Sequence, residues 1–172
     1  WKAVHQHVQG GALEAVLDRA ALSPEQSDIR RQVHETLRKI THDIGTRRTF
    51  NTAIAALMEL MNALAKFDDR SAQGRAVLQE ALEIVVLGLA PVVPHACHAL
   101  WHELGHAGAV IDERWPQVDT GALVRDEIEV VVQVNGKLRG RVTVPASADE
   151  ATVREAALAD AGVLRYVDGK PI

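Results

Sequence analysis

The sequence predicts a mainly α-helical protein, in which a helical bundle is followed by a small α+β domain. Three observations lead to this fold class. Apolar residues recur at helical spacing through the first hundred residues, this period is lost in the Gly- and Asp-rich stretch that follows, and strand alternation begins near residue 126. The predicted division is therefore a bundle over 1–106, a linker over 107–125 and a small domain over 126–172.

The composition indicates a folded chain that can bury a core, with 172 residues of which 47% are hydrophobic. The apolar run 81–93 is too short to span a bilayer, and no signal-like segment opens the chain, so no membrane partner is expected. One cysteine, Cys97, cannot form an internal disulfide, which favours a cytoplasmic location. The net charge of −4 argues against a generally basic nucleic-acid binder, so any such contact must be local.

The first two predicted helices cover 2–18 and the stretch after Ser23, where serine is the N-cap and Pro24 takes the first helical position. The second helix is amphipathic and is expected to end at Gly45. Its apolar stripe contains Ile29, Val33, Leu37, Ile40 and Ile44, and the opposite side carries Arg31, His34, Arg38 and His42.

Three more helices complete the predicted bundle. The fourth, 72–90, is apolar almost all round and should be central. The fifth starts at Pro94 and stops at Gly105. The third has a face of Phe50, Ile54, Leu57, Met58, Met61 and Leu64, and the fifth has a core face of Cys97, Leu100, Trp101 and Leu104. Residues expected to be mostly buried are Leu57, Met61, Val85, Leu89, Leu100 and Trp101.

A β-hairpin over 127–145 opens the small domain. A two-residue Asn-Gly turn would pair apolar Val132 with Arg139, so a three-residue loop 134–136 is expected instead. That register pairs Val132 with Leu138, Ile128 with Val142 and Glu129 with Arg141. A capping box at 147–150 then predicts a helix to about residue 159, followed by a strand and a turn at Asp168-Gly169. The return strand is missing, so the small domain is predicted to be truncated.

Cations gather in two places. Strand alternation predicts that Lys137, Arg139 and Arg141 share one face, at about 6.5 Å intervals that suit nucleic-acid phosphates. The bland alternative is a solvated strand face. The second place is 30–48, where six cations face two acids for a local charge of +4. Its members are Arg30, Arg31, Arg38, Lys39, Arg47 and Arg48, against Glu35 and Asp43.

One stretch has the pattern of a zinc peptidase, His102-Glu103-Leu104-Gly105-His106. No third ligand follows at the metzincin spacing, where Ala109 and Asp112 stand. Gly105 is also expected to end the helix before His106 joins the face of His102. No zinc site and no catalytic residue is therefore predicted in this chain, and Cys97 is expected to be a small buried side chain.

Several blocks together resemble one known family. They are the run Arg47–Asn62, the stretch Ala90–His95, the pairs Leu100-Trp101 and Trp115-Pro116, and Val132–Arg139. Their order and spacing are similar to the C-terminal part of bacterial leucyl-tRNA synthetase. The resemblance implies an anticodon-binding-type bundle of a class I synthetase, followed by a small domain that grips the outer corner of tRNA.

By this resemblance, the chain is expected to be the tRNA-binding portion of a leucine–tRNA ligase and to lack the catalytic site. Its partners would be tRNA(Leu) and the catalytic and editing domains of the same polypeptide, and it would hold no cofactor, because ATP and Mg act in the absent catalytic domain. The candidate tRNA-binding residues are Lys137, Arg139, Arg141 and Asn135, with Arg31, Arg38, Arg47 and Arg48 as a weaker set. The alternatives are a stand-alone RNA-binding adaptor and a zinc metallopeptidase.

Overall fold

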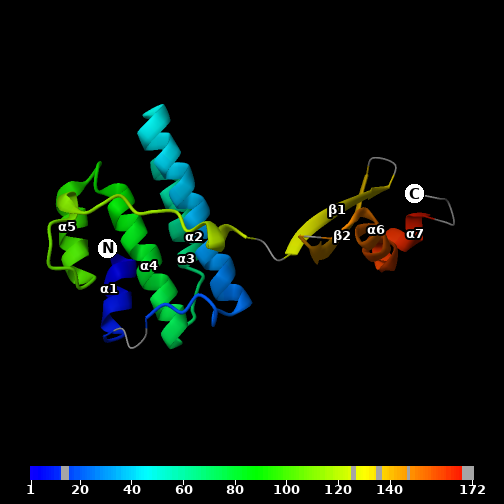
Figure 1. Ribbon diagram of the computed structural model, residues 1–172, viewed down its shortest axis with the longest axis horizontal. Helices are drawn as coiled ribbons and strands as arrows, with labels where there is room; N and C mark the ends of the chain where they lie inside the picture. The colour runs from blue at the N-terminus through cyan, green and yellow to red at the C-terminus, as the bar shows by residue number, and fades with distance from the viewer. Residues whose placement is uncertain (13–15, 125–126, 135–136, 147, 168–172) are drawn as a thin grey trace. The chain divides into compact units, whose positions relative to one another are not determined.

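The computed structural model describes residues 1–12, 16–124, 127–134, 137–146 and 148–167, and it divides into two compact units (Figure 1). The first unit is helical and covers 1–123, and the second covers 124–172 and contains a two-stranded sheet with two helices. Among the described residues, no helix is long and apolar enough to cross a membrane.

The helices of the first unit pack around α4, as the sequence predicts. Its elements are α1 Lys2–Gln9, α2 Pro24–His42, α3 Phe50–Leu64, α4 Ala72–Leu89 and α5 Pro94–Glu103, with a π-helical turn Asp43–Arg47 and 3-10 turns Val110–Asp112 and Thr120–Leu123. Helix α4 contacts α1, α2, α3 and α5. A Cβ at Gly88 of α4 would lie 2.8 Å from Ile40 Cδ1, so this glycine lets α2 approach closely. The central position predicted for the fourth helix is confirmed.

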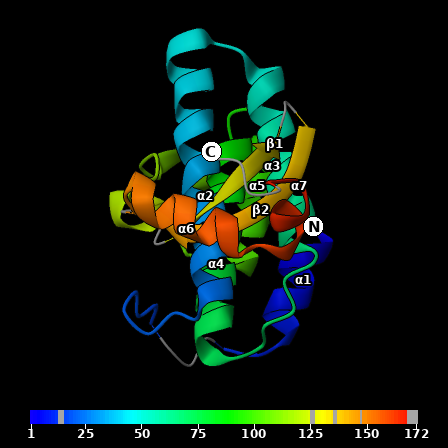
Figure 2. The ribbon, with the colours of Figure 1, turned by 90° about the vertical axis from the view of Figure 1, so that its right-hand side faces the viewer.

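The start of α2 follows the prediction and its end does not. Ser23 is the N-cap, its Oγ accepting from Gln26 N at 3.2 Å while Gln26 Oε1 accepts from Ser23 N at 2.8 Å. The helix does not stop at Gly45, because the chain continues into the π-helical turn and reverses at Arg48, whose φ is +54°. Figure 2 shows α2 and α3 side by side beyond this corner.

The predicted faces are correct at most positions. Helix α1 is shorter than the predicted 2–18, because it ends before Gly10 and Gly11, two residues with low helix propensity. His34 was expected on the outer side of α2 but is buried, and Phe50 and Met58 of α3 are exposed. The residues expected in the core are buried at Leu57, Val85 and Trp101 and partly buried at Met61, Leu89 and Leu100.

The stretch expected to be a linker packs against the helices over its described part. Val110 is buried, and Trp115 and Val118 pack against the core. Trp115 Nε1 donates to Thr41 Oγ1 at 2.8 Å. The two units divide between Leu123 and Val124. Composition missed this packing because Gly and Asp remove the helical period without preventing a loop from covering a core.

A buried histidine of α1 forms a hydrogen bond with a glutamine of α4. His7 is 4% exposed, and its Nε2 lies 2.8 Å from Gln79 Oε1. Burial lowers the pKa of His7, which the hydrogen bond to Gln79 only partly opposes, and Arg75 and Arg70 lower it further. A histidine pKa depressed by folding contributes stability above the unfolded value, and this stability is lost as pH falls.

We therefore expect the free energy of unfolding to decrease as pH falls below about 6.5, the ordinary histidine pKa, and to decrease less in His7→Leu. Urea titrations between pH 8 and pH 5 measure the difference. His5→Leu, at an exposed position of the same helix, is the matched control. Parallel pH profiles for wild type and His7→Leu would contradict the assignment.

The second unit is a hairpin covered by two short helices. Strands β1 Glu127–Val134 and β2 Lys137–Pro145 are antiparallel, with helices α6 Glu150–Ala159 and α7 Ala161–Val167 contacting β2. Its core contains Val142, Val144 and Ala157, with Val130 and Val132 packed against them.

Helix α6 is confirmed, although its N-cap is Asp149, which accepts from Thr152 N. The strand predicted after it is wrong, since α7 stands there. The turn predicted at Asp168-Gly169 lies outside the described residues.

The predicted hairpin register is also wrong. Val134 pairs with Lys137 and Gln133 with Leu138, the register that a two-residue connection gives. A bulge next to Val132 then shifts the pairing, so that Val132 lies opposite Gly140 and Val130 opposite Val142. The extra residue in β2 restores the match of apolar with apolar positions that the simple two-residue turn would have lost.

Candidate nucleic-acid interface

The three cations of β2 do not form the single row that alternation predicts. Lys137 lies opposite Val134 and Arg141 opposite Val131, and these two β1 positions face opposite sides of the sheet. Arg139 is the extra residue of the bulge, between Leu138 opposite Gln133 and Gly140 opposite Val132. The same shift explains why Leu138, expected in the core, is 52% exposed.

The exposure of these cations still suits contacts with an acidic partner. Lys137 and Arg141 are exposed, and Arg139 is half-buried. The register sets Glu129 opposite Thr143 and Arg141 opposite Val131, so the predicted direct pairing of Glu129 with Arg141 across the strands is wrong. Asn135, also a candidate, lies outside the described residues. The contacts of this set with tRNA stay predictions.

Arg139 makes a contact that the sequence analysis did not foresee. Its guanidinium carbon lies 3.8 Å from the centroid of the Tyr166 ring in α7. A cation this close to an aromatic face is attracted by the ring quadrupole. The available signal was compositional, since Tyr166 is the one tyrosine of the sequence, but its segment was expected to be a strand.

The second set of cations, in the bundle, is divided by the structure. Arg31 has an 18% exposed side chain and pairs with two acids of its own helix, Asp28 and Glu35. Arg38 and Arg48 are exposed. Arg47 is 53% exposed and donates to Asp43 Oδ1 at 3.2 Å. Arg38, Arg47 and Arg48 are therefore better placed than Arg31 to reach a phosphate.

A buried carboxylate organises the corner between α2 and α3. Asp43 accepts from Lys39 Nζ at 2.6 Å and from Arg47 NH1 at 3.2 Å. Hydrogen bonds from Lys39 and then Thr52 hold the pKa of Asp43 below its ordinary value. Asp43 therefore stays ionised at neutral pH, and it restrains two of the cations beside exposed Arg48.

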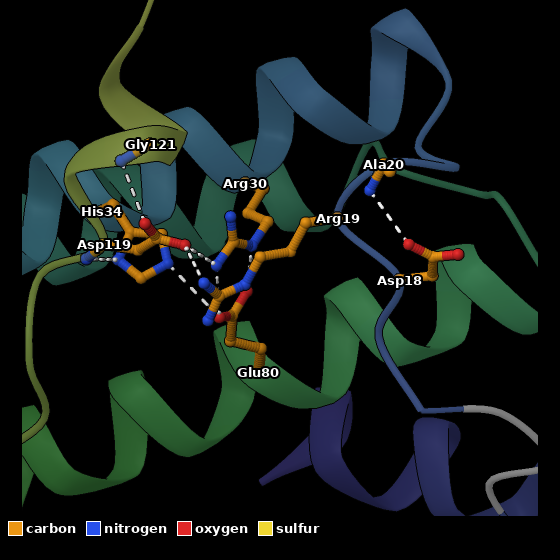
Figure 3. Close-up of polar contacts among 8 residues, drawn as sticks. All are labelled: Asp18, Arg19, Ala20, Arg30, His34, Glu80, Asp119 and Gly121. Carbon is orange, nitrogen blue, oxygen red and sulfur yellow. Dashed lines mark hydrogen bonds and ion pairs between the residues drawn. The ribbon is translucent and has the colours of Figure 1, made fainter.

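One cation counted in the basic stretch is not on the surface. Arg30 is 3% exposed and forms a two-pronged contact with Glu80 of α4, at 2.8 Å and 3.0 Å, while its NH2 donates to Asp119 at 2.7 Å (Figure 3). Asp119 also accepts from Arg19 at 3.1 Å. This group, Arg30 with Glu80, Asp119 and His34, is called the polar clamp below, and it fixes the stretch expected to be a linker onto α2 and α4.

The tautomer of His34 follows from its two partners in the polar clamp. Asp119 N donates to His34 Nδ1 at 3.2 Å, so that nitrogen is the acceptor. The proton then lies on Nε2, which is 3.3 Å from Glu80 Oε1 and can donate to it. Every charged or polar member of the clamp thus has a partner, as burial requires.

The zinc-like motif is divided by the end of its helix. Gly105 has φ +97° and follows the end of α5 at Glu103, as predicted. His102 Nε2 lies 3.2 Å from His98 Nε2, whereas His106 stacks on Trp101 and its Nε2 lies 2.8 Å from Glu83. The two histidines thus have separate partners. Within the described ranges, no group of three or more His, Cys, Asp or Glu side chains is arranged to hold a metal ion.

Comparison with known proteins assigns the fold to a class. A family model described as the anticodon-binding domain of tRNA ligase matches residues 26–155. The chain therefore belongs to the anticodon-binding domain family of tRNA ligases. Over its whole length, it is similar to the C-terminal anticodon-binding region of bacterial leucyl-tRNA synthetase, and it does not cover the catalytic core.

Two relatives illustrate the similarity. The chain is 60% identical over all of its 172 residues to leucine–tRNA ligase of Thioalkalivibrio sulfidiphilus. It is 59% identical over 98% of its length to leucine–tRNA ligase of Halorhodospira halophila. In both cases the chain spans 21% of the relative.

A solved structure has the same fold. It is a leucyl-tRNA synthetase of Agrobacterium radiobacter K84, described as a ternary LeuRS-tRNA-LeuAMS complex. The TM-score is 0.79 at 27% identity, over 97% of this chain and 22% of the other. The predicted fold class and family resemblance are confirmed.

Proposed function

We propose that this chain is the tRNA-binding portion of a leucine–tRNA ligase, which positions tRNA(Leu) for ATP-dependent aminoacylation in a catalytic domain elsewhere in the same cytoplasmic polypeptide. The observation that carries the proposal is the similarity of the entire chain to leucine–tRNA ligases at up to 60% identity. The structural relative described as a complex with tRNA supports the choice of partner. ATP and Mg belong to the catalytic domain in this proposal, and the chain itself requires no cofactor.

The chemistry of binding would come from cations of both units, most of them exposed. Lys137, Arg139 and Arg141 form the first set, and Arg38, Arg47 and Arg48 form the second with a smaller share from Arg31. A cation that neutralises a phosphate releases condensed counterions, which makes affinity depend on salt. Because the chain has a net charge of −4, such local sets must provide the attraction.

We expect the triple variant Lys137→Ala, Arg139→Ala and Arg141→Ala to weaken tRNA(Leu) binding and to flatten its salt dependence. Each lost phosphate contact removes about 0.7 to 0.9 from the slope of log affinity against log salt, so the slope should decrease by about 2 to 3. The measurement is a salt titration of tRNA(Leu) binding by the full-length enzyme.

A matched control removes the same charge from the helical unit instead, with Lys2→Ala, Lys66→Ala and Arg70→Ala at three exposed positions. This variant should keep the wild-type slope. If the β2 variant also kept both slope and affinity, the cations of β2 would be only a solvated surface.

A further inference from the structure

Helix α7 lies directly against the bulged part of β2. A Cβ at Gly140 would lie 2.6 Å from Val163 Cγ2 of α7, and a Cβ at Gly162 would lie 3.0 Å from the carbonyl oxygen of Arg139. A side chain at position 140 would force Val163 to shift, and one at position 162 would be tightly packed against the backbone of β2. These close approaches bring the Arg139 side chain onto the ring of Tyr166, with 3.8 Å between guanidinium carbon and ring centroid.

The guanidinium of Arg139 stacks on the Tyr166 ring. Arg139 Nε is buried without a hydrogen-bond partner among the described residues. An unsatisfied buried N–H carries a cost, which an ordinary surface arginine avoids by keeping its Nε in contact with water or an acceptor. The arrangement thus keeps a planar cation against an aromatic ring at some expense.

The surroundings of the contact are open and basic. Tyr166 is 49% exposed and Leu138, beside Arg139, is 52% exposed. Lys137, two residues before Arg139 in β2, is exposed as well, whereas Arg141, two residues after it, is exposed on the opposite side of the sheet from Lys137. A half-exposed aromatic ring and a guanidinium plane are surfaces on which nucleobases stack, and a neighbouring cation such as Lys137 suits an adjoining phosphate.

We propose that Arg139 and Tyr166 form a stacking platform for the exposed face of a nucleobase in the bound tRNA. This inference rests on the proposed function and deepens it, since it adds a base contact to the phosphate contacts. A stacked base releases no counterion, whereas a neutralised phosphate does. The two kinds of contact can therefore be separated by salt.

The test is tRNA binding by the full-length enzyme at several salt concentrations, with transcribed tRNA(Leu) as the probe. Tyr166→Leu removes the π face but keeps apolar bulk, and we expect it to weaken binding about 5- to 150-fold, the range that one lost base–aromatic stack gives. The slope of log affinity against log salt should not change. Tyr166→Phe keeps the ring and should bind within about twofold of wild type.

Two further variants separate stacking from folding. Arg139→Lys keeps the charge but loses the planar group, so affinity should decrease several-fold with the slope retained. Leu164→Ala changes an equally exposed side chain of the same helix, 53% exposed, and should leave binding unchanged. Thermal melting of each variant records whether the second unit stays folded.

The possible outcomes distinguish failure of the stacking platform from failure of the proposed function. Wild-type affinity in both Tyr166→Leu and Arg139→Lys, on an enzyme with a steep salt slope, overturns the platform while the proposed function stands. If Tyr166→Leu fails to fold, Arg139→Lys decides, and wild-type affinity in that variant again overturns the platform. Absence of salt-dependent tRNA binding by the wild-type enzyme would instead refute the proposed function.

Discussion

Replacing Trp101 by alanine is expected to lower the free energy of unfolding of the helical unit by about 3 to 5 kcal/mol, as other buried aromatic truncations do. Trp101 is 4% exposed and lies on the core face of α5 with Cys97, and Leu104 at the C-cap of the helix is buried as well. Its ring also stacks on His106, with 3.7 Å between centroids and planes 9° apart. The truncation therefore leaves a large cavity and removes the surface that holds His106 after the helix has ended.

Trp101→Phe is the matched control. Trp101 Nε1 is buried and makes no hydrogen bond within the described residues, so exchange for phenylalanine loses no polar contact and retains an aromatic ring. Its cost should be clearly smaller than that of Trp101→Ala. Urea denaturation followed by circular dichroism measures both, because helix content reports unfolding without the tryptophan signal. Equal costs for the two variants would mean that the cavity does not determine the effect.

The bundle could be predicted from sequence where one helix decides its own structure. The N-cap at Ser23 uses a partner three residues away, Gly105 ends α5 through its own φ of +97°, and the apolar positions of α4 repeat around the whole helix. The end of α2 could not be read in this way. There the chain forms a π-helical turn that ends at the left-handed Arg48, and Asp43 in this turn has a partner, Thr52, in the next helix. The rule that glycine ends a helix considers only neighbouring residues, so it pointed to Gly45.

The hairpin shows a second limit of local reasoning. Alternation correctly placed Val130, Val132 and Val142 in a core, because that face is buried by α6. It failed at Leu138 and Arg139. The one extra residue in β2 moves the side chains between the bulge and the turn to the opposite face of the sheet from the one that simple alternation predicts. The choice between a longer loop and a bulge depends on what covers β2, and α7 was not foreseen.

The candidate site was predicted less well than the fold because charge was counted along the chain. The +4 of residues 30–48 omits Asp28, Glu80 and Asp119, which lie outside that window and pair with Arg31 and Arg30. Electrostatic partners are set by tertiary distance, and sequence separation carries little information about it. The exposed cations are therefore fewer than the count suggests. One of the six counted cations, Arg30, is buried.

Arg30→Met should destabilise the helical unit by about 3 to 5 kcal/mol at neutral pH, because loss of one partner of a buried ion pair leaves the other charges uncompensated. Methionine roughly retains the length of the arginine stem, so the cost arises chiefly from the carboxylates of Glu80 and Asp119. Arg19→Met is the matched control, since Arg19 also reaches Asp119 but is 67% exposed. A surface pair of that kind contributes less than about 1 kcal/mol.

The pH dependence of Arg30→Met gives an independent check on the polar clamp. Burial raises the pKa of Glu80, but hydrogen bonds from His34 and Arg30 outweigh it and hold that pKa below its ordinary value. The hydrogen bond from Arg30 likewise lowers the pKa of Asp119. A depressed carboxyl pKa contributes stability above the unfolded value, about 4, and this contribution is lost as pH falls through the folded value.

The difference in free energy of unfolding between wild type and Arg30→Met should thus shrink between pH 7 and pH 4, as the unpaired carboxylates of the variant take up protons first. A difference that stays constant over this range in urea titrations, or an equal loss in Arg19→Met, would mean that the clamp carboxylates do not depend on Arg30.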